Sequence, residues 1–406
     1  MWRRSVCLAN ARIFTGGRLS NSIRFSSRVL EVGATPRRGD VVVDLDGAFV
    51  LPGLVNAHDH LELNHFGRLK FRPTYQSASE WIDDMRPRLR EDPRIREGRE
   101  QPLSDRLLIG GLKNLLSGVT TVAHHNPFYR ELRRWFPTRV VRRYGWAHSF
   151  FLEGQPVGAN GEMATEVKQA YRATPSEAPF LVHVAEGIDR SSREELKRLD
   201  EIGCLANNTV LVHGVGMSFE DWGLARERGA GLVWCPSSNE FLFGCTVSVP
   251  AFLLGSLGKA APICLGTDSR LTGPRDLLEE LRAAREAAPS VTPTELLGMV
   301  TTTPARLLRL PHAGDLVPGA PADFIIVPRL DEDPAGALLA ARRSDLLLVS
   351  LGGRPLVGAP EMSPIFTARR VATRTGQLDG AARLFDRALA RRMARSAIAE
   401  SGLELL

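Results

Sequence analysis

The chain has 406 residues, of which 43% are hydrophobic and 24% charged, as expected for a soluble protein with one large domain and a smaller one. No run of 18 apolar residues predicts a membrane-spanning helix, and the basic N-terminus lacks an apolar segment long enough for a secretory signal. We therefore expect a cytoplasmic protein with no membrane partner. The net charge is +6, but the sequence contains no basic tract interleaved with aromatic residues. The absence of such a tract argues against a nucleic-acid partner.

Short strands are predicted near both ends of the chain. Residues 5 to about 50 contain short apolar runs broken by Gly and Asp, which is typical of antiparallel β structure. The same pattern returns after residue 310, in "ADFIIVP" and "DLLLVSLGG". We predict that residues 1–50 and 311–360 together form a small β-sandwich domain. Residues 361–406 are rich in arginine and are predicted to be a helical C-terminal segment.

Residues 51–310 follow a different rhythm, in which short apolar runs alternate with helical patterns. Seven runs are clear, and an eighth is expected either in 139–151 or in 240–262. Repeated βα units predict a parallel sheet. Eight strands would close a TIM-type barrel, whereas fewer would form an open, doubly wound sheet. Because no GxGxxG motif follows the first run, we favour an α/β fold with a (β/α)8 barrel over 51–310.

Polar residues end one apolar run after another. They are His58, His60, His124, His125, His148, His183, Glu186, His213 and Asp268. The carboxyl ends of all barrel strands meet on one face, so these residues would converge there. Alternation along a strand places His58 and His60 on one face and Asp59 on the other. By the same rule, one of His124 and His125 points into the site and the other into packing.

Such a convergence indicates a metal site. Three imidazoles and a carboxylate suit a divalent cation, most simply Zn²⁺, with Fe²⁺ or Mn²⁺ as alternatives. A second carboxylate that does not bind the metal could carry protons. Each residue alone has a simpler explanation: a hydrogen-bonded core histidine for His58 or His213, a helix N-cap for Asp268, or a solvated loop acid for Glu186. The joint placement favours catalysis.

The order of these motifs resembles the amidohydrolase superfamily. "LPGLVNAHDH" resembles its first barrel strand, and "HVAEG" resembles the HxxE of the branch that contains cytosine, guanine and S-adenosylhomocysteine deaminases and triazine chlorohydrolases. "LVHGVG", "WCPSSNEFLFG" and "LGTDSR" follow in the same order. The resemblance covers roughly residues 5–360.

The resemblance implies roles for individual residues. One metal ion would be bound by His58, His60, His183 and Asp268. Asp268 would also accept a proton from the metal-bound water, and Glu186 would pass it to a ring nitrogen or leaving group. His213 would polarise the hydroxide, and Asn239 would support the loop over the site. No lysine lies between 113 and 168, where the binuclear members place a bridging one, so a mononuclear site is expected.

The resemblance does not identify the substrate. Candidate contacts are Trp81, His125, His148 and Asn239, and core packing is the alternative for the first three. The predicted reaction is hydrolytic deamination of a small heterocyclic amine. Hydrolysis of a cyclic amide or of a C–Cl bond is the alternative, and a non-enzymatic scaffold on the same fold is the alternative of another class. The family resemblance leaves a homodimer open.

Overall fold

The computed structural model describes residues 4–133, 135–150, 162–249 and 262–406. Its N-terminal part is built from short strands, as the sequence predicts. They are β1 (Val6–Ala9), β2 (Arg12–Thr15), β3 (Arg18–Ser20), β4 (Ile23–Phe25), β5 (Val29–Val32), β6 (Val41–Asp44) and β7 (Phe49–Pro52). Four of them form a sheet in the order β5-β4-β1-β6, while β7, β2 and β3 belong to a larger sheet.

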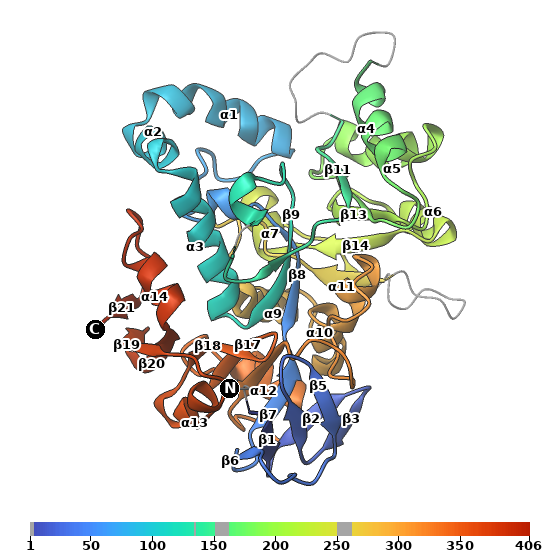
Figure 1. The fold of residues 1–406 in the computed structure, drawn as a ribbon. Coiled ribbons are helices and arrows are strands. Elements are labelled where there is room, and N and C mark those ends of the chain that lie inside the picture. Colours follow the sequence, from blue (N-terminus) through green and yellow to red (C-terminus); the bar gives the residue numbers. More distant parts are fainter. Residues whose placement is uncertain (1–3, 134, 151–161, 250–261) are drawn as a thin grey trace.

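The C-terminal part returns to the same region, so that the two ends of the chain lie side by side (Figure 1). Its strands are β16 (Phe324–Val327), β17 (Leu348–Leu351), β18 (Arg354–Gly358), β19 (Thr373–Leu378), β20 (Ala381–Asp386) and β21 (Leu403–Leu405). With the N-terminal strands they form a nine-stranded sheet in the order β21-β19-β20-β18-β17-β16-β7-β2-β3. Residues of both sheets, including Leu8, Phe25, Val50, Phe324 and Leu348, share one apolar core. This pairing of distant segments agrees with the predicted two-segment β region.

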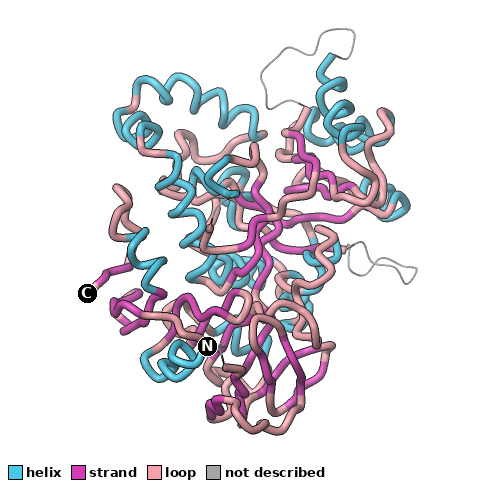
Figure 2. The backbone as a smooth tube through the Cα atoms, viewed as in Figure 1, coloured by secondary structure: helices cyan, strands magenta, loops and turns pink. Residues whose placement is uncertain are grey.

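Eight parallel strands occupy the middle of the chain. They are β8 (Leu54–Asp59), β9 (Val119–His124), β10 (Arg139–Val140), β11 (Gly145–Ala147), β12 (Phe180–Val184), β13 (Thr209–His213), β14 (Gly231–Trp234) and β15 (Ile263–Leu265). The eighth strand, β10, lies in the first of its two expected places. Figure 2 shows these strands at the centre of the molecule with helices around them.

The predicted closed barrel is only partly observed. Among the described residues the strands form two hydrogen-bonded sheets, β10-β9-β8 and β11-β12-β13-β14-β15. The two sheets are joined by hydrogen bonds between β8 and the residues that follow β15. The backbone N–H groups of Thr267 and Asp268 donate to the carbonyl of His58. Gly266 allows this approach, because a Cβ there would lie 2.7 Å from the Cβ of His58. No strand pairing joins β10 to β11 within the described ranges, since only two residues of β10 keep strand geometry.

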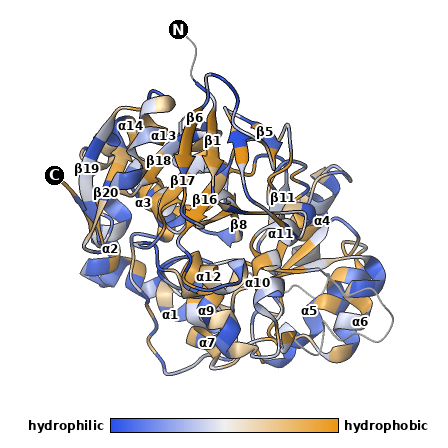
Figure 3. Cartoon of the chain, turned by 90° about the horizontal axis from the view of Figure 1, so that it is seen from below, coloured by the Kyte–Doolittle hydropathy of each residue, from blue (hydrophilic) through white to orange (hydrophobic). Residues whose placement is uncertain are grey.

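Helices follow the central strands. They are α1 (Ala78–Glu91), α2 (Pro93–Glu100), α3 (Leu103–Leu116), α4 (Glu162–Ala173), α5 (Arg190–Glu201), α6 (Phe219–Arg228), α7 (Pro236–Phe243), α9 (Leu277–Ala287), α10 (Pro293–Met299), α11 (Thr302–Leu307), α12 (Pro334–Ala340), α13 (Ser363–Ala368) and α14 (Arg387–Met393). Three end at the predicted glycines, Gly118, Gly203 and Gly229, each with positive φ. Hydrophobic residues concentrate on the strands and polar ones on outer helices such as α5 and α6 (Figure 3). No helix in the described ranges is long and apolar enough to cross a membrane.

The prediction of a helical C-terminal segment is wrong. Residues 361–406 contain the short helices α13 and α14 and the three strands β19, β20 and β21. The turn between β19 and β20 is Asp379-Gly380, with φ of 49° and 83°. A two-residue turn of this kind matches the right-handed twist of a hairpin, so the segment closes on itself and extends the large sheet.

Candidate metal centre

The C-terminal end of β8 supplies the first two histidines. The Nε2 atoms of His58 and His60 lie 3.9 Å and 3.6 Å from Oδ1 of Asp268. The two rings are 4.9 Å apart between centroids and nearly perpendicular. The HxH spacing therefore brings both imidazoles to one side, as the alternation of side chains along a strand requires.

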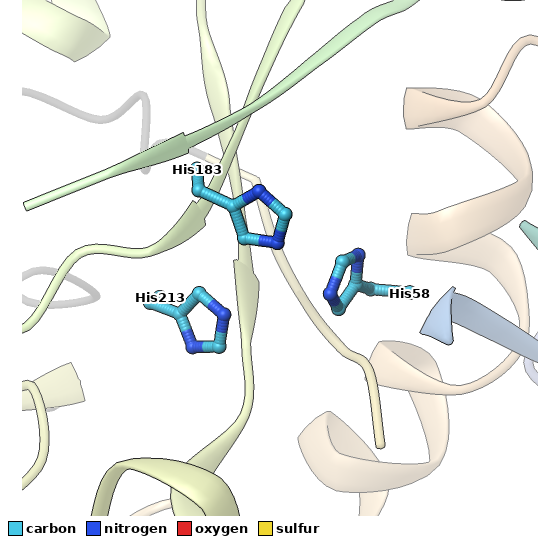
Figure 4. Close-up of side chains that lie close together, drawn as sticks. All are labelled: His58, His183 and His213. Carbon is cyan, nitrogen blue, oxygen red and sulfur yellow. The ribbon is translucent and has the colours of Figure 1, made fainter. Parts of the chain in front are cut away.

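Strands β12 and β13 supply His183 and His213. β12 and β13 are parallel neighbours, and their register pairs Val184 with His213. The His183 ring lies 5.0 Å from that of His58 and 5.3 Å from that of His213. Figure 4 shows the three rings facing one another, with His58 opposite His183 and His213.

These side chains form two overlapping groups with the spacing of metal ligands. In each group the potential ligand atoms lie within 4.8 Å of one another, and the groups are His58 with His183 and His213, and His58 with His60 and Asp268. Both ring nitrogens of His58 and the Nδ1 atom of His183 are buried without a hydrogen-bond partner. Buried polar atoms are rarely left unsatisfied in this way, so the donor set fits a bound cation.

The charge states of the histidines also suit a cation. Burial, reinforced by the neighbouring imidazoles, holds the pKa values of His58 and His183 well below the ordinary value. These rings are therefore neutral at pH 7 and can offer lone pairs, as metal ligation requires.

Asp268 is held rigidly at the end of β15. Its Oδ2 accepts hydrogen bonds from the hydroxyls of Ser238 and Thr272, at 2.8 Å and 2.7 Å. Burial alone would raise its pKa, but the nearby His60 and His213 and these two hydroxyls outweigh burial and lower it. The carboxylate is therefore ionised, and its Oδ1 faces the imidazoles. The backbone at Asp268 has φ of 52°, a conformation that an aspartate adopts rarely and that is common at functional sites.

Glu186 and Asn239 contact His213 from opposite sides. Oε1 of Glu186 lies 3.4 Å from Nε2 of His213, and Oδ1 of Asn239 lies 2.9 Å from Nδ1. The Asn239 side-chain amide donates to Thr246, so its oxygen faces the histidine. The hydrogen-bonding pattern thus assigns a proton to Nδ1 of His213 and leaves Nε2 toward Glu186. The sequence indicated a loop-supporting role for Asn239 but not this direct contact.

Glu186 is an acid outside the two groups of ligand atoms, and only 11% of its side chain is exposed. Burial raises its pKa to about 7, with a further upward contribution from Asp268 and an opposing one from His213. Such a carboxyl group exchanges a proton readily near neutral pH, which is the property required of a general acid and base.

Asp59 belongs to a buried network behind the metal ligands. It faces away from the site, and Asn114 and Asn64 donate to its carboxylate at 2.7 Å and 2.8 Å. Nζ of Lys113 lies 3.3 Å from the same carboxylate and donates to the backbone carbonyl of Asp268 at 2.7 Å. Asp59 and Lys113 thus connect β8 and α3 to the loop that carries Asp268. Alternation along the strand correctly directs Asp59 away from His58 and His60. The contact with Lys113 was overlooked, although a lysine within the apolar stretch "GGLKNLL" is a signal that could have found it.

We predict that Lys113→Met lowers the free energy of unfolding by about 3–5 kcal/mol, because it removes the cation that is paired with the buried carboxylate of Asp59. Urea denaturation measures the change. Lys197→Met, at an exposed position on α5, is the matched control and should change stability by less than about 0.5 kcal/mol. Equal stability of the two variants would show that Lys113 is not an important partner of Asp59.

The doublet His124-His125 divides as alternation predicts. His125 lies among the site histidines, 4.2 Å from the His183 ring between centroids, and one of its nitrogens contacts the Ala147 carbonyl at 3.0 Å. His124 points into packing, where its Nδ1 is 3.3 Å from the backbone N of Leu61.

Two other predicted substrate contacts, His148 and Trp81, differ in how they lie relative to the histidine cluster. His148 lies near the cluster, with its ring 6.0 Å from those of His125 and His183. Trp81 lies on α1, donates to the carbonyl of Leu69, and packs against an apolar cluster that includes Tyr75 and Leu242. These contacts support the core-packing alternative for Trp81.

Glu195 is a second buried acid near Glu186. It accepts a hydrogen bond from the backbone N–H of Ala185, and burial raises its pKa to about 8. The folded state therefore binds a proton that the unfolded state releases between about pH 4.5 and pH 8. This contribution to stability is complete below the unfolded-state pKa and is lost as the pH rises through 8.

We predict that Glu195→Gln weakens this pH dependence. Relative to the unmodified protein, the variant should gain of order 1 kcal/mol or more of stability between pH 5.5 and pH 8.5, because glutamine has no proton to lose. Urea denaturation at the two pH values measures the difference. An identical pH dependence in both proteins would contradict the assignment.

Comparisons with known proteins agree with this geometry. The sequence profile of the amidohydrolase family matches residues 166–348, a range that contains His183, Glu186, His213 and Asp268. The resemblance to this family that the sequence motifs predict is therefore confirmed.

The chain is similar to two curated proteins that are named as deaminases. It is 35% identical over 202 residues to the 8-oxoguanine deaminase of Pseudomonas aeruginosa, an alignment that covers 44% of each chain. It is 26% identical over 376 residues to the 5-methylthioadenosine/S-adenosylhomocysteine deaminase of Syntrophobacter fumaroxidans, covering 78% of this chain and 82% of that one. The first alignment thus spans less than half of the relative's length.

A solved structure supports the fold. The chain is similar to the atrazine chlorohydrolase of Arthrobacter aurescens TC1 complexed with zinc, with a TM-score of 0.67 and 17% identity, over 90% of this chain and 99% of the other. At this identity the similarity establishes the fold.

Proposed function

We propose that this amidohydrolase is a metal-dependent hydrolase of C–N bonds that deaminates a small heterocyclic amine. The observation that carries the proposal is Glu186. This buried carboxyl has a pKa raised to about 7 and lies 3.4 Å from His213, beside a cluster of neutral imidazoles and an ionised aspartate. Such a site can supply both a nucleophile and a proton for the leaving group.

The proposed ligands of a single cation are His58, His60, His183 and Asp268. A divalent cation of the zinc type, when bound, lowers the pKa of a water molecule toward neutrality and so supplies hydroxide. Fe²⁺ and Mn²⁺ suit the same donor set.

The remaining steps belong to residues of the chain. We assign Asp268 as acceptor of the water proton, because its ionised carboxylate lies among the ligand atoms. Protonated Glu186 delivers its proton to the ring nitrogen next to the carbon under attack. When the adduct collapses, its hydroxyl proton returns to Glu186, and the proton held by Asp268 goes to the amino group, which leaves as ammonia. His213 is held by Asn239 in the tautomer that directs Nε2 into the site.

Two other reactions use the same residues. Opening of a cyclic amide needs the same proton transfer to nitrogen, and displacement of chloride needs protonation of the ring nitrogen. Deamination is favoured because both curated relatives described above are named as deaminases. A non-enzymatic scaffold is disfavoured, because the proposed ligands and Glu186 are all present and grouped.

The test is product analysis across a panel of aminopurines, aminopyrimidines, pterins and triazines. Ammonia release from at least one compound, lost in Glu186→Gln, would support deamination. A new carboxylate or free chloride without ammonia would contradict it and favour the alternatives. No turnover of any compound by protein with a full metal complement would also count against the proposal.

We predict that Asn239→Ala lowers kcat about 10- to 100-fold with little loss of metal, because His213 is no longer held in one orientation and tautomer. Steady-state kinetics with metal analysis measures both effects. Asn239→Asp, which keeps an acceptor at the same place, should retain more activity than Asn239→Ala. Equal activity of Asn239→Ala and the unmodified enzyme would contradict the role of Asn239.

The proposed setting follows from the sequence. We propose that the enzyme acts in the cytoplasm on a small molecule and that residues 51–310 form the catalytic domain.

A further inference from the structure

A cavity of about 220 Å³ lies against Glu186. It is lined by five serines, Ala78 and three carboxylic acids, Glu186, Asp189 and Glu195. None of the residues that line it is basic or aromatic. Its volume corresponds to about seven water molecules, enough for a ring substituent with a similar number of non-hydrogen atoms.

One wall of this cavity is built by backbone hydrogen bonds. The N–H of Ala78 donates to the carbonyl of Glu186 at 2.9 Å, and that of Ile188 donates to the carbonyl of Gln76 at 2.7 Å. Gly187 lies so close to this segment that a Cβ would be 2.6 Å from the Gln76 carbonyl oxygen. The segment before α1 is thereby held against the loop after β12.

The lining comes from the segments that follow three strands, including the first turns of α1 and α5. Ser77 and Ser79 follow β8, Ser149 follows β11, and the remaining serines follow β12. These segments lie at the carboxyl ends of the strands, on the same face as the metal ligands. A substrate whose reacting carbon lies at the cation and whose ring nitrogen meets Glu186 would extend a substituent into this cavity.

We infer that this cavity binds a neutral, hydroxyl-bearing substituent of the substrate, such as a sugar, and rejects a phosphorylated one. The inference rests on the proposed function, since it assigns the part of the substrate that does not react. An enzyme with this cavity acts on nucleoside-like amines in preference to free bases and to nucleotides.

The lining gives the chemical reason. Serine hydroxyls donate and accept hydrogen bonds, as sugar hydroxyls do, so several complementary pairs can form. The carboxylate of Asp189 caps α5 by accepting from the N–H of Ser192, which neutralises the helix end that would otherwise attract an anion. A phosphate would find no basic side chain among the lining residues to balance its charge.

The experiment measures kcat/KM for two sets of three compounds. Each set contains a free base, its nucleoside and its nucleoside 5′-phosphate, and the two bases are adenine and guanine. In the metal-loaded enzyme, kcat/KM for the nucleoside should exceed that for its free base and its phosphate at least tenfold. Ser192→Ala should lower the ratio of nucleoside to base three- to tenfold through KM, the effect of one lost hydrogen bond. Ser176→Ala, at the opposite end of β12, is the control and should keep the ratio.

Calorimetric binding of the nucleosides to Glu186→Gln separates this inference from the proposed function. One outcome is that nucleosides bind Glu186→Gln tightly, that this binding weakens in the double variant with Ser192→Ala, and that the unmodified enzyme releases no ammonia. That outcome would support sugar binding in the cavity and reject deamination. Deamination of free bases with no preference for nucleosides would overturn the inference and leave the proposed function standing. Equal or better turnover of the 5′-phosphate would also overturn it.

Discussion

Glu186→Gln should lower kcat by about 10²–10⁴-fold while the metal content stays unchanged. Glutamine keeps the size and hydrogen-bonding capacity of the side chain but cannot carry a proton. Because Glu186 lies outside the proposed ligand set, the cation should remain bound. Steady-state ammonia release, with metal analysis of the same sample, measures both quantities.

The control for this variant is Glu240→Gln, which neutralises an exposed acid on α7. It should retain full activity. If Glu186→Gln retained more than about half of the activity, proton transfer by Glu186 would be contradicted. If it instead lost the metal, Glu186 would have to be counted among the ligands.

Asp268→Ala should abolish both metal binding and turnover, with a loss of activity of at least about 10³-fold. The carboxylate is the only anion in the proposed ligand set, and its removal also leaves the hydroxyls of Ser238 and Thr272 without their acceptor. Metal analysis of the purified variant, followed by assay after adding Zn²⁺, measures the effect. Treatment of the unmodified enzyme with a chelator should give the same loss, reversed by Zn²⁺.

Asp83→Asn, at an exposed position on α1, is the control for this change. It should keep the metal and the activity. Normal turnover by metal-free Asp268→Ala would contradict a metal-dependent reaction.

The edge of the parallel strands that carries the site could be predicted from the sequence because its histidines follow a simple rule. Side chains alternate along a strand, and parallel strands end on the same face. These two facts correctly place His58 beside His60 and direct Asp59 away from them. They also separate His125, which joins the cluster, from His124, which does not.

The network behind the ligands could not be predicted in this way. Lys113 reaches Asp59 and the Asp268 carbonyl only because α3 packs across the end of β8, and no local pattern fixes that crossing. The contact between Asn239 and His213 likewise depends on how α7 begins after β14. Contacts between side chains far apart in the sequence follow from packing.

The C-terminal segment was misread for a different reason. Its arginine and alanine residues suggested a helix, and the strands β19 and β20 are partly exposed, so their alternation is weak. The stronger signal was the Asp379-Gly380 pair, which is typical of a tight hairpin turn. Weighting that dipeptide above composition would have predicted the hairpin.

The most direct test of the account is a crystal structure of the enzyme purified without added metal, with anomalous data collected at the absorption edge of the metal that it contains. The account predicts one anomalous peak per chain, with bonds of about 2.0–2.2 Å to His58, His60, His183 and Asp268. Glu186 should not coordinate the ion. Two peaks per chain, or a single ion bound by His213 in place of Asp268, would contradict the proposed centre.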